Sequence, residues 1–237
     1  MKKTAILIPA RYGSGRFRGK PLTDLGGIPM IKRVVKECIL AGVSGLDTYV
    51  LTDSGLIAHA AVDVGANVWC DPDTEYDNGT DRCAGVMTNS TILDKYDAFI
   101  NVQGDMPDVT SDIINKCRRQ LNDYQVTTVF ADMDPTLQND PNSVKMVRAG
   151  DKALWFGRGM TGYGDWHLGV YGYRRKALAM YSTLDRSEEE DVEGLEQLRW
   201  LKNGYDIGVL KCEFDGIEIN TPEDVVKWNA NMKAGMR

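Results

Sequence analysis

Histidine is scarce in this sequence, and none of its cysteines forms a C-x-x-C pair. Only His59 and His167 offer imidazole ligands, so the composition argues against a zinc site. The five cysteines are odd in number and irregularly spaced, which is typical of reduced, mostly buried thiols. The sequence therefore predicts a protein of a reducing compartment rather than a disulfide-linked secreted protein.

Long hydrophobic runs are also missing. The apolar run near the start ends at Ala10 and meets Arg11, which makes it too short for the hydrophobic region of a signal peptide. No other stretch approaches the roughly 20 apolar residues that a membrane-spanning helix needs. We therefore expect no membrane partner and a cytoplasmic location.

Acidic side chains are absent from Met1 to Thr23, although the whole chain has a formal net charge of −6. A local basic patch in an acidic chain suits a small anionic ligand better than a long polyanion. We therefore expect no nucleic-acid partner. The cations of this patch are Lys2, Lys3, Arg11, Arg16, Arg18 and Lys20.

The pattern of apolar residues over the first half of the chain alternates between strands and helices. Short, mostly apolar strands are predicted at 4–8, 48–52, 67–70, 98–102 and 126–131. Helices are predicted from Pro29 to Gly42, from a cap at Asp53-Ser54 to about Val64, and over roughly 110–121. This alternation predicts an α/β fold whose mostly parallel sheet is covered on both faces.

Beyond about residue 133 the pattern changes to a mixed or antiparallel extension. Strands are predicted at 144–148, 153–157, 168–173 and 207–212, and helices at about 175–182 and 191–202. A last helix, over about 221–233, starts with Thr221 as its N-cap and Pro222 as its first residue. We expect one domain over 1–237, with a main part over about 1–132 and a small antiparallel sub-lobe over about 133–215.

The segment from Pro9 to Gly27 reads as a glycine-rich basic loop that leaves the carboxyl end of the first strand. Ligands of open α/β sheets bind at this edge, and glycine lets the backbone approach them closely. The loop is not a P-loop, because Pro21 follows Lys20, and Arg18 stands where a dinucleotide fingerprint has its third glycine. The cations of this loop predict a site that neutralises a triphosphate.

Several short motifs follow one another along nearly the whole chain. They are Pro9-Ala10-Arg11-Tyr12 with Gly19-Lys20-Pro21-Leu22, Asn78-Gly79-Thr80-Asp81-Arg82, Asn101–Pro107, His167–Arg174, Glu193–Arg199 and Asn220–Asp224. In their residues and in their order along the chain, these motifs resemble those of the 3-deoxy-manno-octulosonate cytidylyltransferases, the CMP-Kdo synthetases. This resemblance implies a single Rossmann-like, GT-A-like nucleotidyltransferase domain that works as a homodimer. It also implies transfer of CMP from CTP to an acidic 2-keto sugar, with release of pyrophosphate and magnesium as cofactor.

The resemblance also implies roles for individual residues and for the two parts of the domain. The part over about 1–132 would bind the nucleotide, and the part over about 133–215 would bind the sugar and form the dimer contact. The nucleotide-binding residues would be Pro9, Ala10, Arg11, Arg16, Lys20, Asn78, Gly79, Thr80, Arg82 and Gln103. The sugar-binding residues would be Arg158, His167, Tyr171, Glu196 and Gln197, the catalytic ones Arg11, Lys20 and Asp105, and the magnesium ligands Asp105 and Asn220.

Two positions and one segment depart from the family pattern. Asn220 replaces the family's second metal-binding aspartate, so Asp105 would hold magnesium alone with CTP or together with Glu218. Met106 replaces the glutamate of the Q-G-D-E-P motif, and the segment over 157–166 is shorter than the family's and lacks its R-A-x-I-P-W motif.

These departures leave two alternatives open: a non-catalytic nucleotide-binding homologue, and an enzyme that activates a different acidic sugar. A sugar-nucleotide-dependent glycosyltransferase is disfavoured, because Asp105 and Asp108 lack D-x-D spacing.

Overall fold

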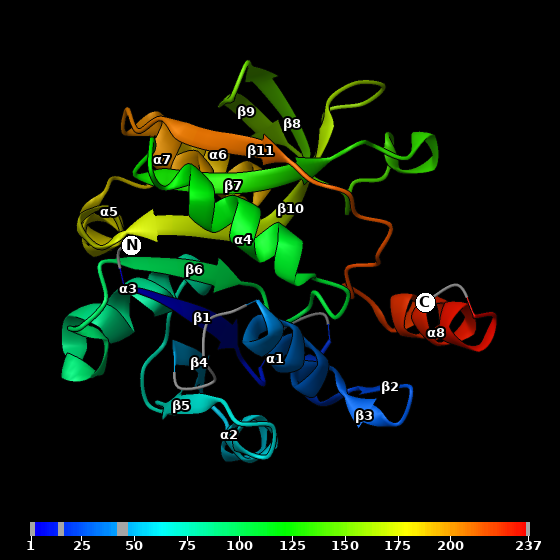
Figure 1. Ribbon diagram of the computed structural model, residues 1–237. Coiled ribbons are helices and arrows are strands. Elements are labelled where there is room, and N and C mark those ends of the chain that lie inside the picture. The colour runs from blue at the N-terminus through cyan, green and yellow to red at the C-terminus, as the bar shows by residue number, and fades with distance from the viewer. Residues whose placement is uncertain (1–2, 14–16, 42–46, 236–237) are drawn as a thin grey trace.

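The computed structural model describes residues 3–13, 17–41 and 47–235. Lys2, Arg16 and Gly42, which carry predictions above, lie outside these residues. A nine-stranded mixed sheet runs through the molecule in the order β5-β4-β1-β6-β10-β7-β11-β9-β8 (Figure 1). The predicted α/β fold with a single mixed sheet and a small antiparallel part is confirmed. Within the described ranges, no helix is long and apolar enough to span a bilayer.

The strands of the first half lie side by side and parallel. They are β1 (Thr4–Ala10), β4 (Thr48–Thr52), β5 (Asn67–Cys70) and β6 (Ala98–Val102). The sequences of β1, β4 and β6 are buried nearly throughout, as expected for strands covered on both faces, whereas β5 at the edge of the sheet is only partly buried. Because parallel strands share one direction, the carboxyl ends of β1, β4 and β6 meet at the same edge of the sheet.

The second half adds both parallel and antiparallel strands. β7 (Val126–Ala131) and β11 (Ile207–Lys211) are parallel, whereas β10 (Asp165–Arg174) runs antiparallel between β6 and β7. β8 (Lys145–Ala149) and β9 (Lys152–Gly157) form the antiparallel edge. Since Val170 lies opposite Val102, the beginning of β10 lies at the edge where β1 and β6 end.

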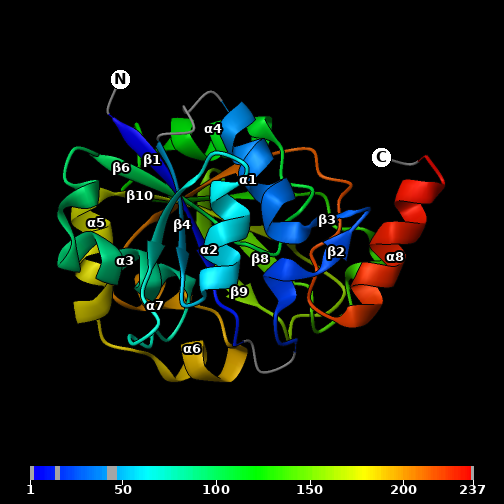
Figure 2. The same ribbon diagram turned by 90° about the horizontal axis from the view of Figure 1, so that it is seen from below.

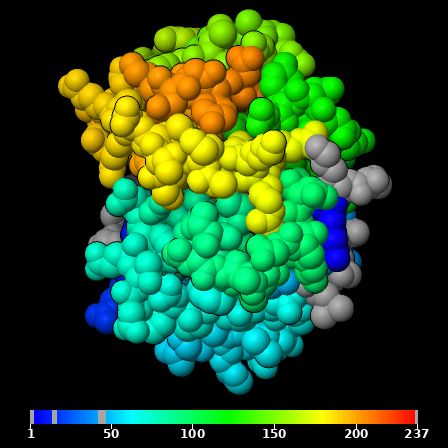
Figure 3. Space-filling view, turned by 90° about the vertical axis from the view of Figure 1, so that its left-hand side faces the viewer, coloured from blue at the N-terminus to red at the C-terminus, as the bar shows by residue number. Residues whose placement is uncertain are grey.

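Two layers of helices cover the sheet. One face carries α1 (Met30–Leu40), α2 (Gly55–Val62) and α4 (Ser111–Gln120), and the other carries α3 (Gly79–Asn89), α5 (Arg175–Met180) and α7 (Leu198–Lys202) (Figure 2). Alternate residues of β1 point to opposite faces of the sheet. Ile6 and Ile8 pack against the first helix layer, and Ala5 and Leu7 pack against the second. On the second face, the α3 and α5 regions form a continuous surface (Figure 3).

The last helix, α8 (Pro222–Lys233), packs beside the hairpin formed by β2 (Asp24–Leu25) and β3 (Ile28–Pro29) (Figure 1). The hydroxyl of Thr221 and the carboxylate of Asp224 form a reciprocal capping box at its start, and Thr221 is the N-cap, as the sequence predicted. The buried indole of Trp228 anchors the helix under the guanidinium of Arg33, 4.6 Å from the ring centroid.

Several predicted elements differ from the structure. The helix predicted over 191–202 is two short helices, α6 (Glu188–Glu193) and α7, because Gly194 adopts a left-handed conformation with φ of 63° and ends α6. Helix α3 was not predicted, and Pro29 is the N-cap of α1 rather than its first residue. The segment predicted as one loop from Pro9 to Gly27 contains β2 and a 3-10 turn over Lys20–Leu22.

Candidate active site

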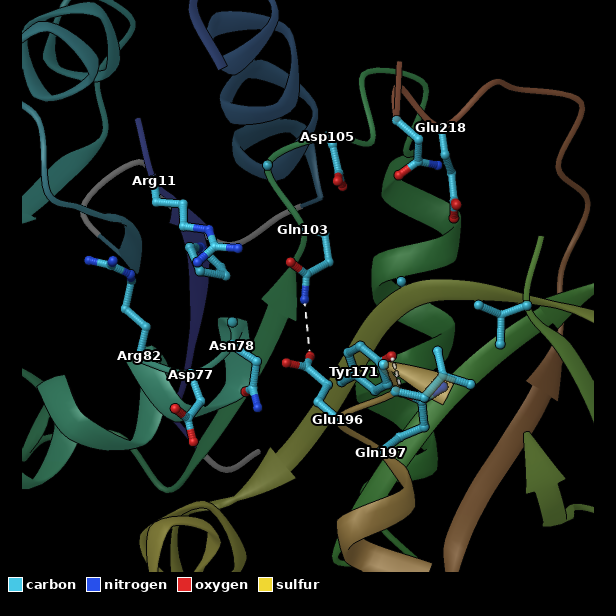
Figure 4. A pocket seen from close by; sticks show the side chains of 18 of the residues that line it. Arg11, Asp77, Asn78, Arg82, Gln103, Asp105, Tyr171, Glu196, Gln197 and Glu218 are labelled. Carbon is cyan, nitrogen blue, oxygen red and sulfur yellow. Dashed lines mark hydrogen bonds between the residues drawn. The ribbon is translucent and has the colours of Figure 1, made fainter. Parts of the chain in front are cut away.

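A pocket of about 440 Å³ opens at the edge of the sheet where β1 and β6 end (Figure 4). The predicted site residues that line it are Pro9, Ala10, Arg11, Lys20, Asn78, Gly79, Arg82, Gln103, Asp105, Arg158, His167, Tyr171, Glu196, Gln197 and Asn220. Arg16 lies outside the described residues. Thr80 is fully buried and is not part of the pocket lining.

The loop after β1 supplies cations to one end of the pocket. Gly19 adopts a φ of 71° and donates its N–H to the carbonyl of Tyr12, which closes a turn that few other residues could form. This turn presents Lys20, whose Nζ lies 2.7 Å from Oδ2 of Asp105, while Arg11 is exposed at the rim. One cation is therefore paired with the central carboxylate, and the other faces solvent.

The amino end of α3 forms the neighbouring wall. Oδ1 of Asn78 caps the helix by accepting from the N–H of Asp81, and Nδ2 of Asn78 donates to the hydroxyl of Tyr181 at 3.0 Å. The side chain of Arg82 is held over the ring of Tyr76, 4.8 Å from its centroid. A helix amino end favours anionic groups, and an adjacent guanidinium strengthens that preference.

Glu196 joins this wall to the end of β6. Its carboxylate accepts from the N–H of Thr80 at 3.1 Å, from the hydroxyl of Thr80 at 3.0 Å and from Nε2 of Gln103 at 3.2 Å. Burial raises the pKa of this carboxyl, although the bonds to Thr80 oppose the rise. Glu196 was predicted to bind the sugar, and the structure places its carboxylate in contact with two residues predicted to bind the nucleotide.

The β10 wall contains a cluster of buried polar groups. The hydroxyl of Tyr171 donates to Oε1 of Gln197 at 3.1 Å, and Gln197 is only 1% exposed. Nε2 of Gln197 has no hydrogen-bond partner in the described part of the chain. A buried amide donor that lacks a partner is costly unless something in the pocket accepts from it.

His167 lies in the same wall and is neutral over most of the pH range. Its Nε2 lies 3.0 Å from Oγ1 of Thr128, and its ring packs against Phe156 and Tyr171 with centroid distances of 4.9 and 5.4 Å. Burial, helped by the positive charge of Arg158, lowers the pKa of His167 to about 3. The uncharged imidazole can therefore serve as a hydrogen-bonding group of the pocket.

Arg158 follows β9 and is positioned through both its backbone and its guanidinium, whose Nη1 donates to the carbonyl of Asn142 at 2.8 Å. Its N–H donates to Oε2 of Glu193 at 2.6 Å, and its carbonyl accepts from Nζ of Lys145 at 2.9 Å. Lys145 is fully buried, and its Nζ also donates to the carbonyls of Asp140 and Ser143. The sequence reasoning missed Lys145, although a lysine between the apolar neighbours Val144 and Met146 is a signal of an unusual environment.

The carboxylate of Asp105 and the amide of Asn220 both line the pocket and offer hard oxygen donors. Within the ranges that the structure describes, no group of three His, Cys, Asp or Glu side chains is arranged to hold a metal ion. Magnesium typically uses one or two carboxylates together with substrate phosphates, so this donor set fits magnesium that arrives with a nucleotide. Glu218 lines the same region, and burial together with the charge of Asp105 raises its pKa to about 7.

Comparison with known proteins agrees with this geometry. Residues 5–207 match the family described as Cytidylyltransferase. The 8-amino-3,8-dideoxy-manno-octulosonate cytidylyltransferase of Shewanella halifaxensis (strain HAW-EB4) is 39% identical over 93% of this chain and 94% of its own. The protein of the same name from Shewanella baltica (strain OS185) is also 39% identical, over 94% and 95% of the two chains.

A solved structure extends the likeness to three dimensions. It is a CMP:2-keto-3-deoxy-manno-octonic acid synthetase complexed with CTP, 32% identical to this chain, and it covers 98% of this chain and 99% of its own with a TM-score of 0.86. The family match, the full-length relatives and the shared fold together establish that the chain belongs to the cytidylyltransferase family.

Proposed function

We propose that this protein transfers CMP from CTP to a 2-keto sugar acid of the 3-deoxy-manno-octulosonate type and releases pyrophosphate. The observation that carries the proposal is one pocket lined both by Arg11, Lys20 and Asp105, from the loops after β1 and β6, and by Arg158 and Gln197, from the second half of the chain. The first group suits a triphosphate, and the second suits a polyhydroxylated carboxylic acid. The names of the relatives reported above contain a nucleotide, CTP, and a sugar acid of this type, which supports the assignment.

In this reaction a sugar hydroxyl oxygen attacks the α-phosphorus of CTP, and the bond from that phosphorus to the bridging oxygen breaks. Pyrophosphate leaves with the electron pair, and the hydroxyl proton passes to solvent. Arg11 and Lys20 bind triphosphate oxygens and offset the charge that develops on them. Asp105 and Asn220 would hold magnesium, which would supply positive charge to offset that of the phosphates.

The sugar half of the pocket orients the acceptor. The guanidinium of Arg158 pairs with the sugar carboxylate, for which its planar fork is suited. The unpartnered Nε2 of Gln197 donates to a sugar oxygen, and the neutral imidazole of His167 adds a further polar contact. These contacts fix the attacking hydroxyl in line with the α-phosphate, which is the main way that such enzymes accelerate transfer.

We propose the 8-amino-3,8-dideoxy form as the preferred acceptor, because full-length relatives 39% identical to this chain carry that sugar in their names. The departure of the 157–166 segment from the Kdo-family pattern supports an acceptor other than Kdo itself.

We also propose a cytoplasmic homodimer. Five free cysteines, of which only Cys70 is exposed, support a reducing compartment. Leu154 and Tyr163, 55% and 58% exposed beside the antiparallel edge strands, support a subunit contact there. Light scattering during size-exclusion chromatography measures the molar mass and tests the dimer. A monomeric mass would refute it.

The test of the proposed activity is pyrophosphate release with CTP and magnesium, in the presence of Kdo, 8-amino-Kdo or no acceptor. We expect release that depends on the acceptor, with a higher kcat/KM for the amino sugar. Asp105→Ala should lower kcat on the order of 100-fold or more. Asp112→Ala, on the exposed surface of α4, is the matched control and should leave kcat unchanged. CTP binding without turnover on either sugar would instead favour the non-catalytic homologue.

A further inference from the structure

The segment that contains Asn220 is tied to the loop that contains Asp105. The N–H of Ile219 donates to the carbonyl of Asp105 at 3.0 Å, and the N–H of Ile217 donates to Oδ2 of Asp108 at 2.9 Å. Oδ1 of Asp108 also accepts from Nε1 of Trp228 at 2.8 Å, which links the same loop to α8. The 217–220 segment and Asp105 therefore have a fixed relative position.

Within this segment the side chains alternate between the protein interior and the pocket. Ile219 is fully buried in the cluster beneath α8, whereas Glu218 and Asn220 on either side of it both line the pocket. Gly169, which lies within the register shift of β10 against β7, lines the pocket with them. Figure 4 shows the carboxylates of Asp105 and Glu218 directed into the same part of the pocket.

Two carboxylates line this part of the pocket, and only one of them forms a close ion pair within the part of the chain that the structure describes. Lys20 lies 2.7 Å from Asp105 and offsets one carboxylate, and Asn220 contributes an oxygen without charge. The second carboxylate, Glu218, has no ion-pair partner within 4 Å among the described residues. Two carboxylates and an amide oxygen in one part of the pocket form the oxygen-rich donor set that magnesium and manganese prefer.

We propose that Glu218 is the second carboxylate ligand of the divalent cation, with Asp105 as the first and the amide oxygen of Asn220 as a neutral third donor. This inference rests on the proposed function and deepens it. It means that the negative charge missing at position 220 is restored by a residue two positions earlier in the same extended segment. The metal site is then complete, and Asn220 does not mark a loss of activity.

The test measures the affinity of the full chain for Mn²⁺. Electron paramagnetic resonance reports how much Mn²⁺ is bound. Titrations are made without nucleotide and with CTP, and without any acceptor, so that no turnover occurs. Glu218→Gln should weaken Mn²⁺ binding at least about tenfold, because even supporting residues of metal sites typically contribute 10- to 100-fold. Glu213→Gln, at an exposed glutamate near the same segment, should match the wild type.

A second substitution separates loss of a ligand from damage to the pocket. In the Glu218→Gln background, Asn220→Asp should restore most of the lost Mn²⁺ affinity by moving the charge two residues along the chain. A Glu218→Gln protein that binds Mn²⁺ as tightly as the wild type and shows a raised KM for the sugar would overturn the inference and assign Glu218 to the acceptor. A wild-type protein that binds CTP but no Mn²⁺ would instead count against the magnesium cofactor of the proposed function.

Discussion

Replacing His167 by glutamine should remove a specific pH dependence of folding. The imidazole is 3% exposed, lies between two aromatic rings and bonds to Thr128, and its pKa is lowered from 6.5 to about 3. In the unfolded chain the same side chain takes up a proton near its ordinary pKa. Between these two values the unfolded state binds more protons, so the folded state loses stability as the pH falls.

The size of the effect follows from the two pKa values. The full difference corresponds to roughly 5 kcal/mol, since one pKa unit is about 1.4 kcal/mol. Only part of this free-energy difference can be measured in the pH range where the protein stays folded. Between pH 8 and pH 5 the unfolded histidine becomes almost fully protonated, and the free energy of unfolding should fall by about 2 kcal/mol through His167 alone.

Urea unfolding followed by circular dichroism at several pH values measures this contribution. The wild type should lose about 2 kcal/mol more than His167→Gln between pH 8 and pH 5, because other titrating groups act equally in both proteins. His59→Gln is the control, because His59 is exposed on α2 and meets water in both states. Parallel pH profiles for the wild type and His167→Gln would show that the folded protein accommodates a charged imidazole and would refute the reasoning.

Three further substitutions test other parts of the structure by urea unfolding. Lys145→Met leaves three backbone carbonyls without their donor and should cost at least about 2 kcal/mol, with a KM that rises more for the sugar than for CTP. Glu190→Gln removes the charge that pairs with buried Arg199 at 2.7 Å and should cost roughly 3–5 kcal/mol. Gly172→Ala would place a methyl group 2.3 Å from Oγ1 of Thr127 and should cost about 1–3 kcal/mol, so unchanged stability would mean that β10 and β7 can separate there.

The sequence predicted the strands better than the helices, for a physical reason. Strands such as Thr48–Thr52 and Ala98–Val102 are buried on both faces, so their runs of apolar residues mark them out. Helix α3 is different, because its amphipathic pattern begins among the polar residues Asn78 and Gly79, which alone suggest only a turn. The break at Gly194 was also missed, since a single glycine inside a helical pattern is tolerated at a cost and does not by itself mark the end of a helix.

The contents of the pocket were largely predictable, but the contacts within it were not. Motifs and strand ends identify which residues gather at the sheet edge, because the edge is fixed by strand direction. They do not reveal that Glu196 bonds to Thr80, since the two residues are far apart in sequence and the contact depends on how the turn before α7 packs against the start of α3. The role of Asp108 in fixing the 217–220 segment is likewise a tertiary contact that spacing cannot predict.

Because Lys20 and Asp105 form an ion pair, substrate binding in the proposed reaction would exchange one set of charge pairs for another. In the free protein these two groups satisfy each other at 2.7 Å, so neither waits in the pocket as a bare charge. Under the proposed function, Lys20 would pair with phosphate oxygens of an entering metal-bound triphosphate, and Asp105 would be free to hold the metal. Each group would then exchange one opposite charge for another, so the pocket would accept a highly charged substrate with little change in its own electrostatic balance.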